Sequence, residues 1–449
     1  MGILGFAGTV GLITGLIHLY LWKRLVRDTT RPGRWRRVGG FAVLTLALLI
    51  PVTMIGLRVG LGWLAWSGYL WLALMFYLLV LLVILELPML VAKLVLRYRA
   101  KVAAPAAAPE PALAFVGSAG ARATLTAPAE AADSSTPPSA PSAPPTGPAA
   151  AADASPAVPS EPAGSEPEHD PSRRLLLARG AAIFAGLTAV GVTGYGVRTA
   201  LGPPRLDRVQ IPLAKLPRSM DGLRIATVSD IHIGPLAGRA HTERIVASIN
   251  RLDADIVAIV GDLVDGTVAE LGEAAAPLRD LQAKHGSYFV TGNHEYYSGV
   301  EEWVVELDRL GLEVLQNERR EIHARGGMLD LAGVNDPAGQ GFGFAEGPDY
   351  DAALGGRDPD VPVVLLAHQP VMVHEAAKHG VDLQLSGHTH GGQMVPFNLL
   401  VALQQPVVSG HATIDGTQIY VTNGAGSWGP PVRVGAPPEI TLVELRSTT

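Results

Sequence analysis

Four stretches of the chain are apolar enough and long enough to cross a membrane. They are Ile3 to Trp22, Val38 to Leu57, a segment within Trp63 to Ala92, and the run from Ser172 to about Val197. A helix needs about 20 such residues to cross the apolar core of a bilayer. The pattern therefore predicts a membrane region over residues 1–100 with three transmembrane helices, and a fourth transmembrane helix over residues 173–202.

The segment between these regions, residues 101–172, has a different composition. It is rich in Ala, Pro and Ser, carries scattered acidic residues, and contains almost no large apolar residue. Such a segment buries too little apolar surface to offset the entropy lost on ordering. We therefore expect a disordered linker that proline keeps partly extended.

Basic residues between the predicted spans indicate how the chain is oriented. The segment from Lys23 to Arg37 carries seven basic residues and one acid, Asp28, and an excess of this kind belongs on the cytoplasmic side. The pair Arg173-Arg174 places the start of the fourth helix on the same side, so everything after about Gly202 is expected on the outer face. This pair also resembles a twin-arginine export signal, although it is internal here.

Glu86 is the one acid inside the predicted spans. An ionisable residue within a membrane is by default a candidate functional residue. The alternative is that Glu86 lies near the inner end of the third span and reaches water or another helix.

From Leu223 onward the pattern changes to that of an α/β domain. Five short apolar runs end in polar clusters: Leu223 to Asp230, Ile256 to Asp262, Ser287 to Asn293, Val363 to His368, and Leu383 to His388. Helical segments are expected at Arg239 to Arg251 and Ala269 to Lys284. Hairpin-like runs follow at Glu313 to Ile322, Met328 to Val334, Gln418 to Thr422 and Glu439 to Leu445. Strands that alternate with helices are typical of βαβ units, so residues 203–449 are predicted to form an α/β domain with mixed sheets.

Composition narrows the possible chemistry. The chain has 449 residues, enough for two or three domains, and a net charge of −6 with a pI near 6.1, which argues against a general nucleic-acid binder. It contains no cysteine, which excludes disulfides and thiolate metal sites. Any metal site must therefore use oxygen and imidazole nitrogen.

Each of the five apolar runs ends in residues that can bind a metal. The clusters are Asp230-Ile231-His232, Gly261-Asp262 with Asp265, Gly292-Asn293-His294-Glu295, His368, and Gly387-His388-Thr389-His390. Taken singly, an Asp after a strand is more often a helix cap, and Asn-His or His-X-His can be a polar turn. Five such clusters at strand ends of one domain favour a metal centre.

In this order, the clusters resemble the motifs of the calcineurin-like metallophosphoesterases. The resemblance extends from about Gly222 to the C-terminus. The run Trp428 to Arg433 is similar to the membrane-tethered bacterial branch of that family. The resemblance implies two mixed β-sheets sandwiched between helices, here preceded by the membrane region.

The resemblance also implies a role for each cluster. One metal ion would be held by Asp230, His232 and His390, a second by Asn293, His368 and His388, with Asp262 bridging both. A hydroxide between the two ions would attack phosphorus, and the nitrogen and oxygen donors suit Mn, Fe or Zn.

His294 is the expected catalytic residue, as proton donor to the leaving oxygen or as stabiliser of the transition state. Many relatives have Asp after this histidine. Here Glu295 takes that place and could orient the ring. Asp265 is expected to support a ligand or cap a helix, and Arg433 either clamps a phosphate oxygen or is a solvated side chain.

The sequence therefore predicts a multi-pass protein of the cell membrane that hydrolyses phosphate esters on the outer face, and its composition is compatible with monoesters, diesters or lipid-linked substrates. One alternative is a pyrophosphatase that acts on a nucleotide-linked lipid. Another is a phosphate sensor or transport-associated protein without catalysis. No nucleic-acid or protein partner is evident from the sequence.

Overall fold

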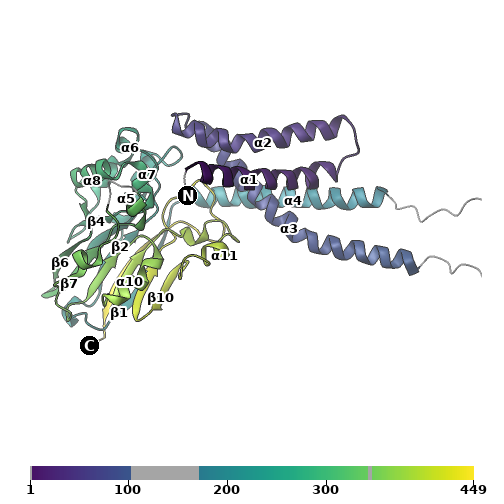
Figure 1. Ribbon diagram of the computed structural model, residues 1–449. Helices are drawn as coiled ribbons and strands as arrows, with labels where there is room; N and C mark the ends of the chain where they lie inside the picture. Colours follow the sequence, from purple (N-terminus) through teal and green to yellow (C-terminus); the bar gives the residue numbers. More distant parts are fainter. Residues whose placement is uncertain (1–2, 103–170, 342–345, 449) are drawn as a thin grey trace, which may run out of the picture. The chain divides into compact units, whose positions relative to one another are not determined.

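Four long helices and an α/β domain make up the described chain (Figure 1). The structure is a computed structural model and describes residues 3–102, 171–341 and 346–448. The long helices are α1 (Ile3–Leu21), α2 (Arg34–Arg58), α3 (Leu64–Val102) and α4 (Pro171–Ala200). The chain divides into two units, Met1–Leu87 together with Ser172–Thr449, and Pro88–Pro171. The predicted linker, residues 101–172, lies outside the described residues except at its two ends.

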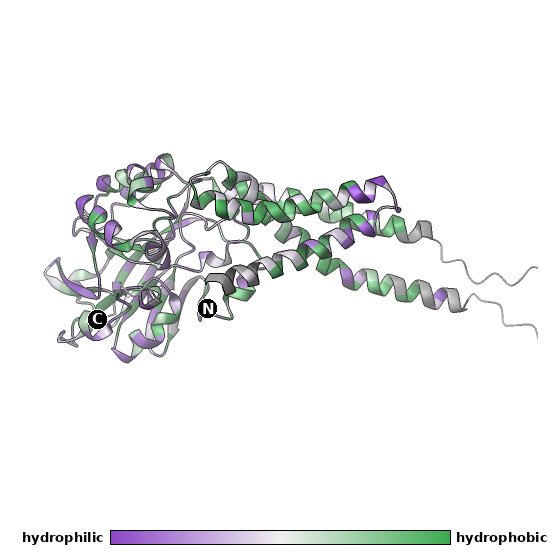
Figure 2. Ribbon diagram, turned by 45° about the horizontal axis from the view of Figure 1, so that its top comes forward, coloured by the Kyte–Doolittle hydropathy of each residue, from purple (hydrophilic) through white to green (hydrophobic). Residues whose placement is uncertain are grey.

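Three of the described helices are long and apolar enough to cross a membrane. The candidate spans are Arg34–Leu57, Leu64–Ala92 and Leu175–Ala200. Figure 2 shows hydrophobic residues along much of their length, and many of these side chains are exposed; Leu187 is 72% exposed. Such exposure to water is unfavourable, whereas lipid tails remove it. The first predicted span forms helix α1, and its crossing of a membrane stays a prediction.

Glu86 of α3 contacts another helix. Tyr20 of α1 donates a hydrogen bond to Glu86 Oε1 (2.8 Å), and Arg24, in the π-helical segment Trp22–Arg27 that follows α1, pairs with Glu86 Oε2. These contacts confirm the alternative in which the carboxylate reaches another helix. Because partners satisfy both of its oxygens, we read Glu86 as a residue that holds these segments together.

The first sheet of the α/β domain has six strands. In spatial order they are β1 (Arg205–Leu213), β12 (Glu439–Ser447), β2 (Leu223–Val228), β3 (Ile256–Val260), β4 (Ser287–Val290) and β5 (Glu313–Val314). Strands β2 to β5 are parallel, and β12 runs antiparallel to β2. The carboxyl ends of β2, β3 and β4 therefore lie at one edge of the sheet.

The second sheet also has six strands. In spatial order they are β10 (Gly410–Ile414), β11 (Thr417–Val421), β9 (Leu383–Ser386), β8 (Val363–Leu366), β7 (Gly327–Gly333) and β6 (Glu318–Ala324). The four central strands are parallel and the two outer strands antiparallel. The prediction that Glu313 to Ile322 forms one hairpin-like run was wrong. Glu313–Val314 pairs in the first sheet, whereas Glu318–Ala324 pairs in the second.

The main core lies between the two sheets. Strand β3 is apolar throughout because both of its faces are buried. One face, Ile256, Ala258 and Val260, belongs to the cluster between the sheets. The other face, Val257 and Ile259, belongs to a second cluster on the opposite side of the sheet. Alternate residues of a strand point to opposite faces, so a strand covered on both sides is apolar throughout.

Helices cover the outer faces of both sheets. On the first sheet, α5 (Arg239–Asn250) and α8 (Val300–Arg309) contribute buried residues to the outer cluster, while α9 (Tyr350–Leu354) and α10 (Val373–Lys378) do so on the second sheet. The shorter helices are α6 (Val268–Ala275), α7 (Asn293–Ser298) and α11 (Asn398–Val401). The arrangement confirms the expected fold of two mixed sheets between helices.

We expect Ile225→Ala to destabilise the α/β domain, because Ile225 is fully buried between the sheets. Loss of a buried Ile side chain lowers the free energy of unfolding by about 2–5 kcal/mol. Urea denaturation of the full-length protein in detergent measures this change. The control is Val305→Ala, at a position on α8 that is 70% exposed. Equal midpoints for the two variants would contradict the packing described here.

Candidate metal centre

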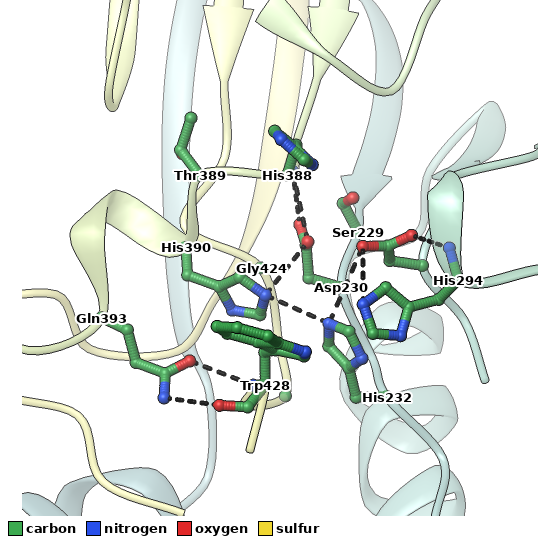
Figure 3. Close-up of polar contacts among 12 residues, drawn as sticks. Ser229, Asp230, His232, His294, His388, Thr389, His390, Gln393, Gly424 and Trp428 are labelled. Carbon is green, nitrogen blue, oxygen red and sulfur yellow. Dashed lines mark hydrogen bonds and ion pairs between the residues drawn. The ribbon is translucent and has the colours of Figure 1, made fainter. Parts of the chain in front are cut away.

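The loops after β2, β3, β4, β8 and β9 converge where the parallel strands of both sheets end. Figure 3 shows Asp230 and His232 from the first of these loops, the ring of His294 from the third and the ring of His390 from the fifth gathered at one place. Three groups of side chains have atoms close enough to hold a metal ion: Asp230 with His232 and His390, Asp262 with His368 and His388, and Asp265 with His232 and His294. The first group contains the three residues predicted for one metal ion, and the second joins the predicted bridge Asp262 to two of the three residues predicted for the other.

The first group joins the loops after β2 and β9. His390 Nε2 lies 3.3 Å from Asp230 Oδ1 and 3.1 Å from His232 Nε2. Asp230 also ties the two loops together, because its carboxylate accepts the backbone N–H of His388 (3.0 and 3.2 Å). All three ligand side chains are buried. Two imidazoles and one carboxylate therefore share a space from which water is largely excluded.

The second group is centred on Asp262, which lies between the two sets. Asp262 Oδ2 is 3.1 Å from His368 Nε2 and 4.0 Å from both His232 Nε2 and His294 Nε2. Asp262 Oδ1 accepts the backbone N–H of His294 (2.9 Å). One oxygen is thus fixed by the backbone, while the other faces imidazole nitrogens from both ligand sets.

Asn293 begins helix α7, directly before His294. Its Oδ1 is buried without a hydrogen-bond partner, and His368 Nε2 is buried with only the 3.1 Å ion-pair contact to Asp262 Oδ2. Buried acceptors are seldom left unsatisfied, so each such atom calls for an explanation. A cation bound between Asn293, His368 and Asp262 would satisfy both atoms.

Two of the histidines are oriented by their second ring nitrogen. His232 Nδ1 donates to Asp265 Oδ1 (2.8 Å), and His368 Nδ1 donates to the carbonyl oxygen of Val260 (2.8 Å). In both rings this leaves the lone pair of Nε2 facing the centre. Such outer hydrogen bonds are the usual way to orient a metal-binding imidazole.

Five of the predicted ligands have a left-handed backbone that non-glycine residues rarely adopt. They are Asp230 (φ 52°), His232 (49°), Asp262 (53°), His388 (69°) and His390 (51°). Each such residue costs roughly 1–3 kcal/mol and persists only where the surrounding structure enforces it. The strain is therefore concentrated at the residues that face the centre.

The glycine before Asp262 is required by space as well as by conformation. Gly261 has φ 77°, and a Cβ atom there would lie 2.6 Å from His368 Nδ1. Only glycine lets the backbone pass this close to the His368 ring. The Gly-Asp spacing in the sequence therefore reflects a steric need.

Asp265 supports His294 as well as His232. His294 Nδ1 donates to Asp265 Oδ1 (2.7 Å). Burial alone would raise the pKa of Asp265, but the two neighbouring imidazoles hold it well below its usual range. Burial also lowers the pKa of His294, yet the hydrogen bond to Asp265 and the charge of Asp262 raise it to about 9. His294 is therefore a proton-bearing group that faces Asp262.

The expectation that Glu295 could orient His294 was wrong. Glu295 is buried and accepts backbone N–H groups from Asp262 (3.0 Å), Leu263 (2.8 Å) and Gly292 (2.6 Å). It therefore fixes the loop that carries Asp262, and Asp265 has the role expected of Glu295. The sequence does not show which carboxylate pairs with His294, because Asp265 and Glu295 both belong to the polar clusters that follow the strands.

Arg433 does not clamp a phosphate, and it is not a solvated side chain either. It is fully buried, and it donates to the carbonyl oxygens of His390 (2.8 Å), Asn423 (2.8 Å) and Gly426 (2.9 Å), while its Nη2 lies 3.0 Å from His390 Nδ1. Burial, and then the charge of Arg433, hold the pKa of His390 well below its usual range. A neutral ring is the form that binds metal, so Arg433 positions His390 and keeps it in the form that could bind one.

Sequence reasoning missed Asp336, which follows strand β7. It is fully buried, and Gln369 Nε2 donates to both of its oxygens (3.1 and 3.0 Å). Burial raises the pKa of Asp336, and the charge of His368 opposes this shift. An acid at the end of an apolar run was the same signal that marked the other five loops.

Comparisons with known proteins agree with this geometry. The family model described as calcineurin-like phosphoesterase matches residues 223–392. A transmembrane protein with metallophosphoesterase domain from Danio rerio is 40% identical over 58% of this chain and 61% of its own length, and its counterpart from Bos taurus is 39% identical over 62% and 64%. The chain thus spans less than two thirds of these two relatives.

Two further proteins extend the comparison. A dimetal phosphatase structure from Danio rerio has a TM-score of 0.32 and 15% identity, and it covers 50% of this chain and 93% of its own. An uncharacterised metallophosphoesterase from Helicobacter pylori is 40% identical over 61% of this chain and 73% of its own length. The chain therefore belongs to the calcineurin-like metallophosphoesterase family.

Proposed function

We propose that this protein is a membrane-anchored hydrolase of phosphate esters that uses two divalent cations. The observation that carries the proposal is the position of Asp262, whose Oδ2 faces imidazole nitrogens of both ligand sets. A carboxylate so placed can bind two cations and reduce their mutual repulsion. The complete set of candidate ligands, five of them buried, argues against a protein that merely senses phosphate.

Each cation would have its own ligands besides Asp262. Asp230, His232 and His390 hold one, and Asn293, His368 and His388 hold the other. The unpartnered Asn293 Oδ1 and the position of His368 Nε2 beside Asp262 Oδ2 support this assignment. When bound, the pair supplies positive charge to the phosphoryl oxygens and activates a water molecule. The mixture of nitrogen and oxygen donors suits Mn, Fe or Zn.

His294 is the proposed proton donor to the leaving oxygen. Its Nδ1 proton is bound by Asp265, so the proton on Nε2 points toward the centre, where Asp262 Oδ2 lies 4.0 Å away. The His294 ring remains accessible to solvent, since 17% of its side chain is exposed. A substrate can therefore contact Nε2 from the solvent side.

The α/β domain is proposed to lie on the outer face of the cell membrane. Basic residues gather between the first two predicted spans and again at the start of α4, and such clusters stay in the cytoplasm. Helix α4 then crosses the membrane, and the domain follows directly after it. This orientation disfavours a substrate that is available only on the inner face.

Asp262→Asn is expected to empty both cation sites, because an amide bridges two cations far less well than a carboxylate. Metal bound to the purified full-length protein, measured by plasma mass spectrometry, should fall from two equivalents toward none. The control is Asp253→Asn, which alters an exposed aspartate with a similar left-handed backbone (φ 47° against 53°). Two retained equivalents in Asp262→Asn would rule out the bridge.

His294→Ala should keep the metal and lose turnover. Loss of a proton donor lowers the rate by about 10²–10⁴-fold. Turnover of p-nitrophenyl phosphate and its diester with Mn²⁺, together with metal content, tests this expectation. His323→Ala, at an exposed histidine of β6, is the control. An unchanged rate in His294→Ala would assign proton transfer to another group.

The orientation can be tested because the chain has no cysteine of its own. A membrane-impermeant maleimide added to intact cells should label Val305→Cys, on the exposed side of α8. Pro32→Cys, between the first two predicted spans, should react only after permeabilisation. The reverse pattern would place the domain in the cytoplasm.

A further inference from the structure

The segment Val395–Leu403, which contains α11, is apolar and yet unburied. None of the residues of α11 is buried, and Leu399, Leu400 and Leu403 are 66%, 56% and 81% exposed. Neighbouring Val395 and Phe397 are also exposed. Large apolar residues clustered in this way on one short segment mark a surface that meets an apolar partner.

This segment is attached directly to the metal centre. It begins five residues after His390, and hydrogen bonds of the Gln393 side chain stabilise the turn between them. Gln393 Oε1 accepts the backbone N–H of Trp428, and Gln393 Nε2 donates to the carbonyl oxygen of Trp428, both at 3.0 Å (Figure 3). The Trp428 side chain is itself exposed. An apolar rim therefore lies next to the ligand loop of β9.

The same segment is continuous with the candidate membrane spans. The rings of Phe397 and Phe76 pack edge to face with centroids 6.4 Å apart. Met394 packs against the cluster of buried residues that includes Met75 of α3 and Ala189 of α4. The surface of α11 thus adjoins helices that themselves require lipid.

The depth of this contact points to the bilayer as the partner. Phe76 is not at the end of its span but well inside Leu64–Ala92, about 18 Å along the helix axis from Leu64. A segment that contacts Phe76 therefore lies beside the apolar interior of a candidate span. It is also suited to that position, because residues 394–408 contain no charged side chain.

We propose that Val395–Leu403 enters the lipid leaflet and that the substrates are phosphate esters carried by membrane lipids. The proposal rests on the phosphoesterase function given above and names its substrate class. With the segment embedded, the ligand loop of His388 and His390 lies close to the level of the lipid headgroups. A lipid phosphate then reaches the centre without its acyl chains leaving the bilayer.

Insertion can be measured with single-cysteine variants of the full-length protein in phosphatidylcholine vesicles. Leu403→Cys carries an environment-sensitive fluorophore, and lipids with doxyl groups on their acyl chains should quench it. Val305→Cys, equally apolar and exposed but distant in sequence, should stay unquenched. Equal quenching at both positions, or at neither, would overturn the insertion, and the second result is the one expected if the segment docks a protein.

The substrate class is tested with the double variant Leu400→Ser and Leu403→Ser, which alters only exposed side chains. Turnover with Mn²⁺ is compared for p-nitrophenyl phosphate and its diester and for phosphatidic acid, phosphatidylglycerol and a polyprenyl diphosphate in vesicles. We expect turnover of a lipid substrate to fall about tenfold or more and that of soluble esters to change less than about twofold, since only the lipid substrates need the apolar contact. Val305→Ser is the control.

Two results would count against the lipid assignment. Hydrolysis of soluble esters without hydrolysis of any lipid, or equal losses for both classes in the double variant, would overturn it while leaving the phosphoesterase function in place. Failure of the unaltered protein to hydrolyse either class would instead overturn the phosphoesterase function, and the lipid assignment with it.

Discussion

The burial of two carboxylates among imidazole rings is the constraint on which the rest of the structure depends. Asp230 and Asp262 are withdrawn from water at the carboxyl ends of β2 and β3. A buried carboxylate is strongly unfavourable unless positive charge compensates it. The rings compensate this charge only in part, because His294 is protonated whereas the pKa values of His388 and His390 lie below their usual range, and the proposed cations would complete the compensation. Five candidate ligands have a strained, left-handed backbone, and this backbone directs their side chains to the same point.

The sequence was enough to predict the fold and which side chains gather at the strand ends, because both follow from local patterns. Alternating buried residues explain β3, and parallel strands of a sheet must end at the same edge, so polar residues after them meet. Residues outside that rule were not predictable. The sequence alone suggests that Arg433 is a solvated cation. In the structure it is buried and donates to the carbonyl oxygen of His390, in a loop distant in sequence. Likewise, the choice between Asp265 and Glu295 as partner of His294 depends on side-chain direction, which the sequence pattern does not contain.

Arg433 also connects the centre to the membrane helices. Its backbone N–H donates to the carbonyl oxygen of Gly196 in α4 (2.9 Å), while its guanidinium holds His390. A side chain at Gly196 would collide with Val432, so the close approach of α4 requires glycine there. One residue thus connects a candidate membrane span to a candidate metal ligand. This link, together with the apolar segment after His390, places the candidate metal centre beside the candidate membrane spans.

The central claim is that Asp262 bridges two cations. Anomalous diffraction from crystals of the full-length protein grown with Mn²⁺ tests it most directly. The account predicts two peaks about 3.5–4 Å apart, the spacing of two-metal sites, on either side of Asp262 Oδ2. A single peak, or two peaks that do not share the Asp262 carboxylate, would contradict it.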